Sequence, residues 1–308
     1  MTAIPQGGAS LEFLLTSKWY GQISALTDVS VRFTPGVTGL VGQNGAGKST
    51  MMKLACGLLR PSFGEVFLNG EPPTFPRARQ SLGYCSDIDN YYEHQSGFVF
   101  VAWMLRLSGA SGREARSKAG SLLDELGLGD AMHRKIGGYS KGMRQRVKLA
   151  VALGHDPNVL LMDEPLTGLD PVARQEMAEL MRKLGDAGAV VVVSSHVLHE
   201  LQTIADQIVL VHQGRKLAEG TVGEIREKID DRPRRVHLAT AQPRELAARL
   251  FNQPEITTVT ITHGGVEIAT EAGHGVDGFL TGLGADGLIQ EVVPLDDSLE
   301  SVFGYLVN

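Results

Sequence analysis

The sequence contains only two cysteines, Cys56 and Cys85, among 308 residues. Two cysteines are too few for a disulfide framework, so we expect reduced thiols in a cytosolic protein. Long hydrophobic runs are also missing, because the longest has eight residues, Phe98 to Leu105, whereas a membrane-spanning helix needs about 20. Residues 1–10 show neither the basic nor the apolar segment of a secretory signal. The sequence therefore predicts a cytosolic protein without a membrane helix of its own.

A surplus of basic residues is missing as well. The chain has 29 Lys and Arg against 35 Asp and Glu, a net charge of −6. This charge belongs to residues 231–308, which hold five Arg and eleven Asp or Glu, whereas residues 1–230 hold 24 of each sign. We expect no nucleic-acid partner, because such proteins carry a basic surface. The change in composition near residues 230–233 predicts a boundary between domains 1–230 and 231–308.

Short apolar runs alternate with helical segments in the first domain. Strands are expected at residues 11–15, 29–33, 37–41, 159–162 and 190–193, and helices at residues 48–58, 98–108, 113–126 and 140–154. The runs Val159–Met162 and Val190–Val193 are rich in branched residues, which is typical of buried strands in a parallel sheet. This alternation predicts an α/β architecture.

The second domain has a different order of elements. Strands are expected at residues 236–240, 256–262, 266–270 and 288–293, and helices at residues 243–251, 276–283 and 298–306. The order βαββαβ, followed by a last helix, matches the split βαβ pattern. We therefore expect a small C-terminal α+β domain, which either regulates the first domain or dimerises.

A phosphate-binding loop is the clearest motif. Residues 42–49, Gly-Gln-Asn-Gly-Ala-Gly-Lys-Ser, match G-x-x-x-x-G-K-[ST]. Glycines let successive N–H groups converge on one phosphate, and the helix that follows adds its positive end. Lys48 offers a charge to the β- and γ-phosphates, and Ser49 offers a hydroxyl to Mg²⁺. The alternative, a chance glycine-rich turn, is disfavoured by the expected strand before the loop and helix after it. The expected nucleotide ligands are Gly42, Asn44, Gly45, Ala46, Gly47, Lys48, Ser49 and Thr50.

Acidic residues follow the run at 159–162. Asp163 and Glu164 are expected at the carboxyl edge of the sheet, where α/β proteins bind ligands. Asp163 is expected to hold Mg²⁺ through its water shell, and Glu164 to act as the general base that polarises the attacking water. The alternative is a pair of solvated acids. His196, after the run at 190–193, is expected to hydrogen-bond a γ-phosphate, although a lone histidine in this place is more often structural.

Residues 139–146, Tyr-Ser-Lys-Gly-Met-Arg-Gln-Arg, resemble the signature motif of ATP-binding cassette (ABC) ATPases. Residues 167–171 resemble the family's D-loop, His196 its switch histidine, and Tyr20 the aromatic that stacks on adenine. The motifs stand in the family's order, and the resemblance covers about residues 10–225. It implies a P-loop NTPase fold of the ABC type, with a mixed sheet core and a helical subdomain at about residues 90–150.

The resemblance also implies a site made by two chains. In this family two cassettes pack head to tail, and each ATP lies between one chain's phosphate loop and the other chain's signature. Ser140, Gly142 and Asp170 would then face the partner's nucleotide. The family often has Leu-Ser-Gly-Gly-Gln, whereas this chain has Lys141 and Met143 in place of a Gly and the Gln. Lys141 either adds charge near the partner's nucleotide or is solvated.

The Q-loop departs from the family as well. Asp87 occupies the place of the family's glutamine. A carboxylate still offers an oxygen to Mg²⁺ or water but donates no N–H, so we expect Asp87 to belong to the metal site. The segment from Asp89 to Trp103 carries five aromatic residues, which either form a local core or dock onto a transmembrane partner.

The combined motifs predict an enzyme, the ATP-hydrolysing subunit of an ABC transporter. Its ligands are ATP and Mg²⁺, and its partners are a second ATPase subunit, identical or different, and a transmembrane permease on a separate chain. The chain would attach through that permease to the inner face of the cell membrane. Residues 298–303 resemble the ending of export-type subunits. The alternatives are a non-transport ABC ATPase of translation or DNA maintenance, whose tandem cassettes or coiled-coil insertion do not occur here, and a regulator without turnover.

Overall fold

The computed structural model describes residues 8–89, 91–197, 200–201, 203–221, 224, 235–262, 264–270 and 288–295. The chain divides into two compact units, Met1–Glu219 and Gly220–Asn308. This division lies somewhat before the boundary predicted from the charge pattern. No helix of the described residues is long and apolar enough to cross a membrane.

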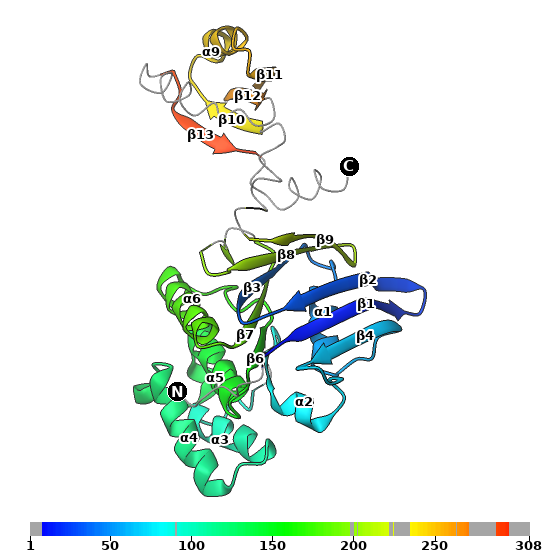
Figure 1. The fold of residues 1–308 in the computed structure, drawn as a ribbon. Coiled ribbons are helices and arrows are strands. Elements are labelled where there is room, and N and C mark those ends of the chain that lie inside the picture. Colours follow the sequence, from blue (N-terminus) through cyan, green and yellow to red (C-terminus); the bar gives the residue numbers. More distant parts are fainter. Residues whose placement is uncertain are drawn as a thin grey trace. The chain divides into compact units, whose positions relative to one another are not determined.

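Unit 1 is built on a six-stranded sheet in the order β5-β6-β7-β3-β8-β9 (Figure 1). Its strands are β3 (Gly36–Val41), β5 (Leu82–Cys85), β6 (Val159–Met162), β7 (Val190–Ser195), β8 (Gln207–His212) and β9 (Arg215–Gly220). The strands from β5 to β8 pair in parallel. Every residue of β6 and β7 is buried, which confirms the prediction of buried parallel strands. The carboxyl ends of β3, β6 and β7 therefore meet at one edge.

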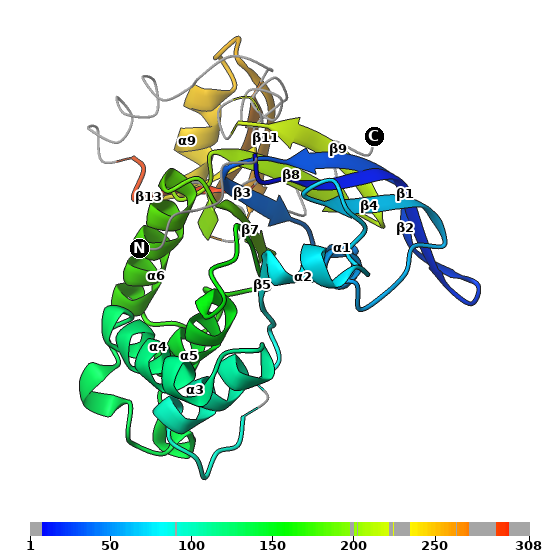
Figure 2. The same cartoon turned by 60° about the horizontal axis from the view of Figure 1, so that its bottom comes forward.

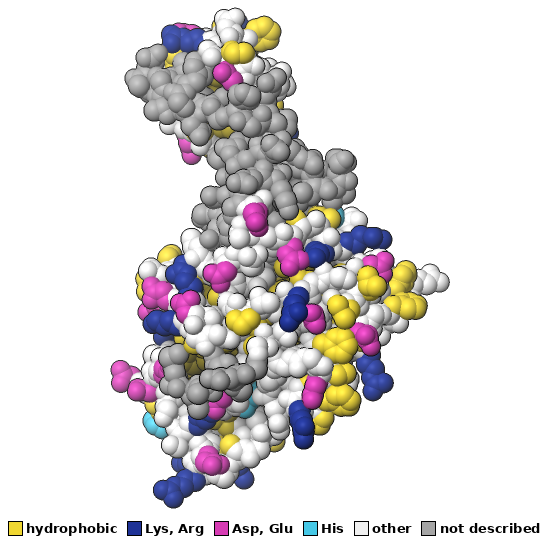
Figure 3. All heavy atoms as spheres, in the orientation of Figure 1, with side chains coloured by type: hydrophobic (Ala, Val, Ile, Leu, Met, Phe, Trp, Pro, Cys, Tyr) yellow, Lys and Arg dark blue, Asp and Glu magenta, His cyan; other side chains and the backbone are white. Residues whose placement is uncertain are grey.

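A three-stranded antiparallel sheet, in the order β2-β1-β4, makes the second layer of unit 1. It contains β1 (Leu11–Tyr20), β2 (Ile23–Phe33) and β4 (Phe63–Leu68). The strands β1 and β2 continue well beyond the predicted stretches and join in a tight hairpin. Large apolar side chains of this sheet stay exposed (Figure 3), among them Leu15, Trp19 and Phe63.

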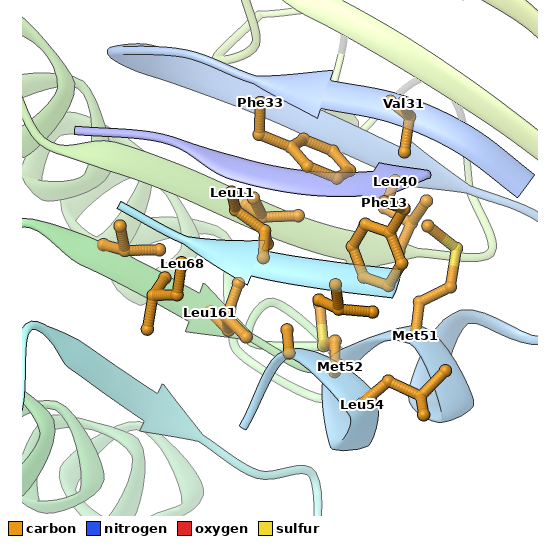
Figure 4. Close-up of a cluster of buried hydrophobic side chains, with 14 of the residues drawn as sticks. Leu11, Phe13, Val31, Phe33, Leu40, Met51, Met52, Leu54, Leu68 and Leu161 are labelled. Carbon is orange, nitrogen blue, oxygen red and sulfur yellow. The ribbon is translucent and has the colours of Figure 1, made fainter. Parts of the chain in front are cut away.

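The main core of unit 1 lies where the two sheets and α1 (Lys48–Ala55) pack together (Figure 4). Phe13 and Phe33 of the antiparallel sheet meet edge to face, with ring centroids 6.3 Å apart. Met52 of α1 and Leu161 of β6 belong to the same cluster, and all four side chains are at most 2% exposed. This packing fixes α1, and therefore the loop before it, against the parallel sheet.

The helices of unit 1 include α2 (Pro76–Gln80), α3 (Gly97–Leu107), α4 (Gly112–Glu125), α5 (Lys141–Leu153) and α6 (Pro171–Asp186), with the 3-10 turns η1 (Gly129–Ala131) and η2 (Ile136–Gly138). Figure 2 shows α3, α4 and α5 gathered together, as their mutual contacts require. Ser111 and Glu114 form a capping box at the start of α4. The helices predicted at residues 98–108, 113–126 and 140–154 are confirmed, whereas α6 is a helix that the sequence analysis did not include.

Unit 2 contains a four-stranded antiparallel sheet in the order β11-β12-β10-β13. Its elements are β10 (Arg235–Ala239), α9 (Pro243–Leu250), β11 (Ile256–Thr262), β12 (Gly265–Thr270) and β13 (Glu291–Pro294). Leu238, Leu246 and Ile268 lie in a core of its own. All four strands and the first helix are confirmed, and the helices predicted at residues 276–283 and 298–306 lie outside the described residues.

Candidate functional site

The phosphate loop connects β3 to α1 at the carboxyl edge of the six-stranded sheet. Gly45 and Gly47 have φ values of +82° and +108°, a region that favours glycine. A Cβ on Gly42 would lie 2.4 Å from the carbonyl oxygen of Val211, so a side chain has no room there. Gly47 caps α1 without a side-chain hydrogen bond, which leaves the first-turn N–H groups for an anion. The predicted ligands all lie in this loop or the first turn of α1: Gly42, Asn44, Gly45, Ala46, Gly47, Lys48, Ser49 and Thr50.

Lys48 joins the loop to the acidic pair. Its side chain is only 6% exposed, and its ammonium donates to the carbonyl oxygens of Gly42 and Gln43. The same nitrogen lies 3.5 Å from Oε1 of Glu164. Because the ammonium already lies over the glycine-rich loop, an anion in the loop would meet a positive charge there.

Asp163 and Glu164 follow directly after β6. Asp163 is buried, and its Oδ1 accepts a hydrogen bond of 2.7 Å from the hydroxyl of Ser194 on the neighbouring β7. Glu164 has a φ of +50°, an uncommon value for a residue with a side chain. Its Oε1 is buried and has no hydrogen-bond partner. The structure thus places Glu164 beside Lys48 and buries Asp163 next to it, so the two acids are not a solvated surface pair.

His196 lies next to Glu164. Its Nδ1 is 2.9 Å from Oε2 of that carboxylate, and Thr167 donates to the same oxygen at 3.1 Å. A carboxylate only accepts, so Nδ1 carries the proton of this contact. Because the imidazole is 44% exposed, its other nitrogen stays accessible to a ligand. The structure therefore brings together Lys48, Glu164 and His196, the three residues predicted to be catalytic, and the predicted metal ligand Asp163 directly precedes Glu164.

The oxygen ligands at this edge suit Mg²⁺, which prefers carboxylate and hydroxyl oxygens and keeps several waters or substrate phosphates. Ser49 lies in the first turn of α1, and Asp163 stands at the end of β6 with only Oδ1 bound to Ser194. In the described residues no cluster of three or more His, Cys, Asp or Glu could hold a metal alone. An ion at this site would depend on phosphate oxygens as well.

Asp87 lies two residues beyond β5 and is exposed. Its backbone carbonyl accepts a hydrogen bond of 3.2 Å from Lys148. Burial first, and then the charge of Asp163, raise the pKa of Tyr84 far above its ordinary value, and Asp87 adds to this effect. Neither the hydrogen bond from Lys148 nor this effect on Tyr84 joins Asp87 to Asp163, so its place in the metal site stays a prediction.

Ser140 and Asp170 cap two neighbouring helices. Ser140 accepts from the N–H of Met143 at 3.3 Å at the start of α5, and Asp170 accepts from the N–H of Ala173 at 2.9 Å at the start of α6. Both residues, with Gly142, line a pocket of about 490 Å³. None of the residues gathered around Lys48 lines this pocket. The chain thus carries two separate surfaces, one with the phosphate loop and one with the signature residues.

The Lys141 side chain lies against its own chain. A Cβ on Gly168 would come within 2.7 Å of the Lys141 ammonium and 3.0 Å of its Cδ. This contact joins the signature to the turn that carries Asp170. Lys141 is also exposed to solvent. Its side chain is therefore solvated on one side and lies against the turn at Gly168 on the other.

Tyr20 stands at the end of β1 and is 46% exposed. The ammonium of Lys18 lies 5.6 Å from the ring centroid, which is a cation–π contact. The neighbouring strand β2 reaches the phosphate loop, because Gly47 closely approaches Leu26 and the carbonyl oxygen of Ala25. The ring is therefore accessible for stacking, and its hairpin contacts the loop.

The aromatic segment divides between core and surface. Phe100 is buried, and Tyr91 packs on it at 5.5 Å while donating to the carbonyl of Arg144. Tyr92 and Trp103 are 64% and 42% exposed and meet at 6.3 Å. The core alternative is therefore confirmed for Phe100 and Tyr91, whereas Tyr92 and Trp103 lie on the surface and their docking onto a partner stays a prediction.

Comparisons with known proteins agree with these motifs. The ABC transporter family matches residues 26–167. The daunorubicin/doxorubicin resistance ATP-binding protein DrrA of Streptomyces peucetius is 38% identical over 221 residues, covering 70% of this chain and 66% of that protein. The Nod factor export ATP-binding protein I of Burkholderia orbicola is 37% identical over 219 residues, covering 69% and 71%.

A solved structure is similar too. The ATP-binding subunit of an ABC transporter superposes with a TM-score of 0.62 and 31% identity, covering 71% of this chain and 92% of that one. The chain spans just under two thirds of the length of the Streptomyces relative. Sequence, fold and site geometry agree: this chain belongs to the family of ABC transporter ATP-binding proteins.

Proposed function

We propose that the chain is an ATP-hydrolysing subunit of an ABC transporter. The observation that carries this proposal is the meeting of Lys48, Glu164 and His196 beside a glycine-rich loop at one edge of the sheet. In this proposal the loop holds the phosphates of ATP, Lys48 neutralises the β- and γ-phosphates, and Glu164 polarises the attacking water. Family membership supports ATP as the anion.

The two oxygens of Glu164 have different surroundings, which supports its role as the base. Oε2 accepts from Thr167 and His196, and these contacts fix the carboxylate. Oε1 makes no hydrogen bond and lies 3.5 Å from the Lys48 ammonium, so in this proposal it is the oxygen that takes the proton of the attacking water. When His196 is protonated, its second nitrogen becomes a donor for the γ-phosphate.

Mg²⁺ is proposed as the cofactor. When bound, it neutralises the phosphate oxygens and orients them for in-line attack. Ser49 would supply a hydroxyl, and Asp163 would hold the ion through its water shell. Asp87, which follows β5, would offer a carboxylate oxygen to the ion or to its water. Tyr20 stacks on the adenine ring.

We further propose that two ATPase subunits, identical or different, share each nucleotide. The phosphate loop and the signature pocket of one chain have no lining residue in common, which supports a site completed by a second chain. Ser140 and Gly142 of the signature, with Asp170, would approach the γ-phosphate held by the partner's loop. The N-terminus of α5 has no acidic residue in its first turn, so its partial positive charge stays available to that phosphate.

The proposed task is export through a separate transmembrane permease, with the chain on the inner face of the cell membrane. Similarity to a Nod factor export protein supports the direction. The exposed pair Tyr92 and Trp103 is the proposed docking surface for the permease, because exposed aromatic groups are enriched at protein interfaces. Residues 1–230 form the proposed ATPase domain, with its helical subdomain at about residues 90–150, and residues 231–308 a regulatory or dimerising domain.

Phosphate release tests the proposal. The wild-type chain should release phosphate from ATP only when Mg²⁺ is present, and Glu164→Gln should lower kcat by about 10²- to 10⁴-fold, the usual contribution of a general base. The variant should still bind ATP and accumulate as a dimer in size-exclusion chromatography with Mg-ATP. Full turnover by Glu164→Gln would falsify the assignment of the base, and a wild-type chain without turnover would contradict the ATPase itself. Purification of the chain from membranes, followed by identification of the membrane protein that accompanies it, identifies the permease.

A further inference from the structure

A single buried hydroxyl connects the two acidic residues of the site. Ser194 lies at the end of β7 with 0% exposure. It donates to Oδ1 of Asp163 at 2.7 Å and accepts from the backbone N–H of Glu164 at 2.9 Å. The contact runs between neighbouring parallel strands, because Met162 pairs with Val193 in the sheet register. Each acid is thus tied to the same atom of β7.

Glu164 needs such a contact because its backbone turns sharply out of the strand. Its φ of +50° lies in the left-handed region, which is unfavourable for a residue with a Cβ. A conformation of this kind persists only where surrounding contacts hold it. Ser194 supplies the partner of this turned N–H group, and its own proton restrains rotation of the Asp163 carboxylate.

We propose that Ser194 is a positioning residue for ATP hydrolysis, which fixes the metal-binding carboxylate and the general base in one mutual geometry. This inference rests on the proposed function. Ser194 acts through Asp163 and Glu164 and does not touch the reacting atoms. The competing explanation is that its hydroxyl only satisfies buried polar groups, so that its loss affects folding alone.

The chain contains a matched control for that explanation. Ser17 on β1 is 4% exposed, donates to Oδ1 of Asp28 at 3.1 Å and accepts from the N–H of Asp28 at 2.9 Å. Asp28 also has a φ of +50°. Ser17 thus makes the same two kinds of hydrogen bond as Ser194, although both go to one residue, and it lies in the antiparallel sheet and contacts neither Asp163 nor Glu164 through them. Ser17→Ala therefore removes the same kinds of hydrogen bond without affecting a contact of Asp163 or Glu164.

The experiment compares full-length wild type, Ser194→Ala, Ser194→Thr and Ser17→Ala. We expect both alanine variants to lower the melting temperature to a similar extent. Only Ser194→Ala should lower kcat, by about 10- to 100-fold as for other groups that orient a metal ligand, with KM for ATP within about twofold of wild type. Ser194→Thr keeps the hydroxyl and should regain most of kcat.

A binding measurement accompanies the kinetics. A fluorescent non-hydrolysable ATP analogue should bind Ser194→Ala and wild type equally in EDTA, whereas the gain in affinity on adding Mg²⁺ should shrink only in Ser194→Ala. Equal kcat and equal Mg²⁺ gain in Ser194→Ala and Ser17→Ala would overturn the inference. If Ser194→Thr does not fold because its methyl group finds no room, the two alanine variants decide the question. If the wild type shows no turnover, the proposed function is contradicted. The comparison of the Mg²⁺-dependent gain in affinity for the ATP analogue would still decide the role of Ser194.

Discussion

Burial determines the pKa of the thiols of Cys56 and Cys85. Burial raises the pKa of each to about 12, from an ordinary value of 9.0, because the thiolate loses its hydration. The nearby charge of Asp163 adds to the shift at Cys56, whereas Lys148 opposes the shift at Cys85. Both groups therefore stay protonated in the folded chain at physiological pH.

This burial predicts that both thiols are unreactive in the native chain. At pH 8 neither thiol should react with a disulfide reagent such as DTNB until the chain unfolds, because the thiolate is the reacting species. Since the folded pKa is raised, the thiols contribute stability below pH 9 and lose it as pH rises from 9 toward 12. Chemical denaturation across this range should show a falling free energy of unfolding. Rapid reaction of either thiol in native protein would contradict the assigned burial.

The positions of the candidate site residues were predictable only where a sequence pattern indicates them. Lys48 stands in a motif that can be read from its spacing, and Asp163 and Glu164 directly follow an apolar run that predicts a buried strand. The hydrogen bonds of Ser194 to the acidic pair could not be read in this way, because they depend on which strands are neighbours in the sheet, and that of Thr167 depends on the turn that follows β6. The available signal for Ser194 was its place at the end of a buried strand, directly before Ser195 and His196.

At the scale of elements, the phosphate loop offers a paired test. Gly45 and Gly47 both have positive φ, but a Cβ on Gly45 meets nothing within 4 Å, whereas one on Gly47 would lie 2.7 Å from Leu26 and 2.8 Å from the carbonyl oxygen of Ala25. Gly45→Ala should cost roughly 1–2 kcal/mol of backbone strain. Gly47→Ala should cost more and weaken ATP binding further, because β2 blocks the added methyl group. Calorimetry and an ATP titration measure both effects, and equal losses in the two variants would refute this explanation.

Most elements with strong apolar patterns were predicted, but β8 was missed although its residues Ile208 to Val211 are all buried. The strands β6 and β7 are apolar on both faces and were found. The strand β4 was missed because half of its residues are exposed, which leaves only a weak apolar pattern. The helix α6 was missed although Asp170 and Pro171 form a readable start and Met177 and Met181 share a buried face.

At the scale of the whole molecule, the two units have separate cores. Leu246 belongs to the core of unit 2, and Leu161 to the core beneath the phosphate loop. Leu246→Ala should destabilise unit 2 by about 2–5 kcal/mol while ATP affinity stays at the wild-type value. Leu161→Ala should lower both stability and ATP affinity. Hydrogen exchange resolved by unit, with an ATP titration, tests this difference, and loss of ATP binding in Leu246→Ala would contradict independent cores.

The separation of the phosphate loop from the Ser140 pocket has a consequence for mixtures of two inactive variants. A Lys48→Ala chain keeps an intact signature pocket, and a Ser140→Ala chain keeps an intact phosphate loop. Each variant therefore lacks a different part of the shared site. If sites are shared, mixing two inactive variants should produce hybrid pairs with one complete site and restore phosphate release that neither parent shows. Two mutants that fail to complement each other after mixing, although hybrids form, would mean that each chain works alone.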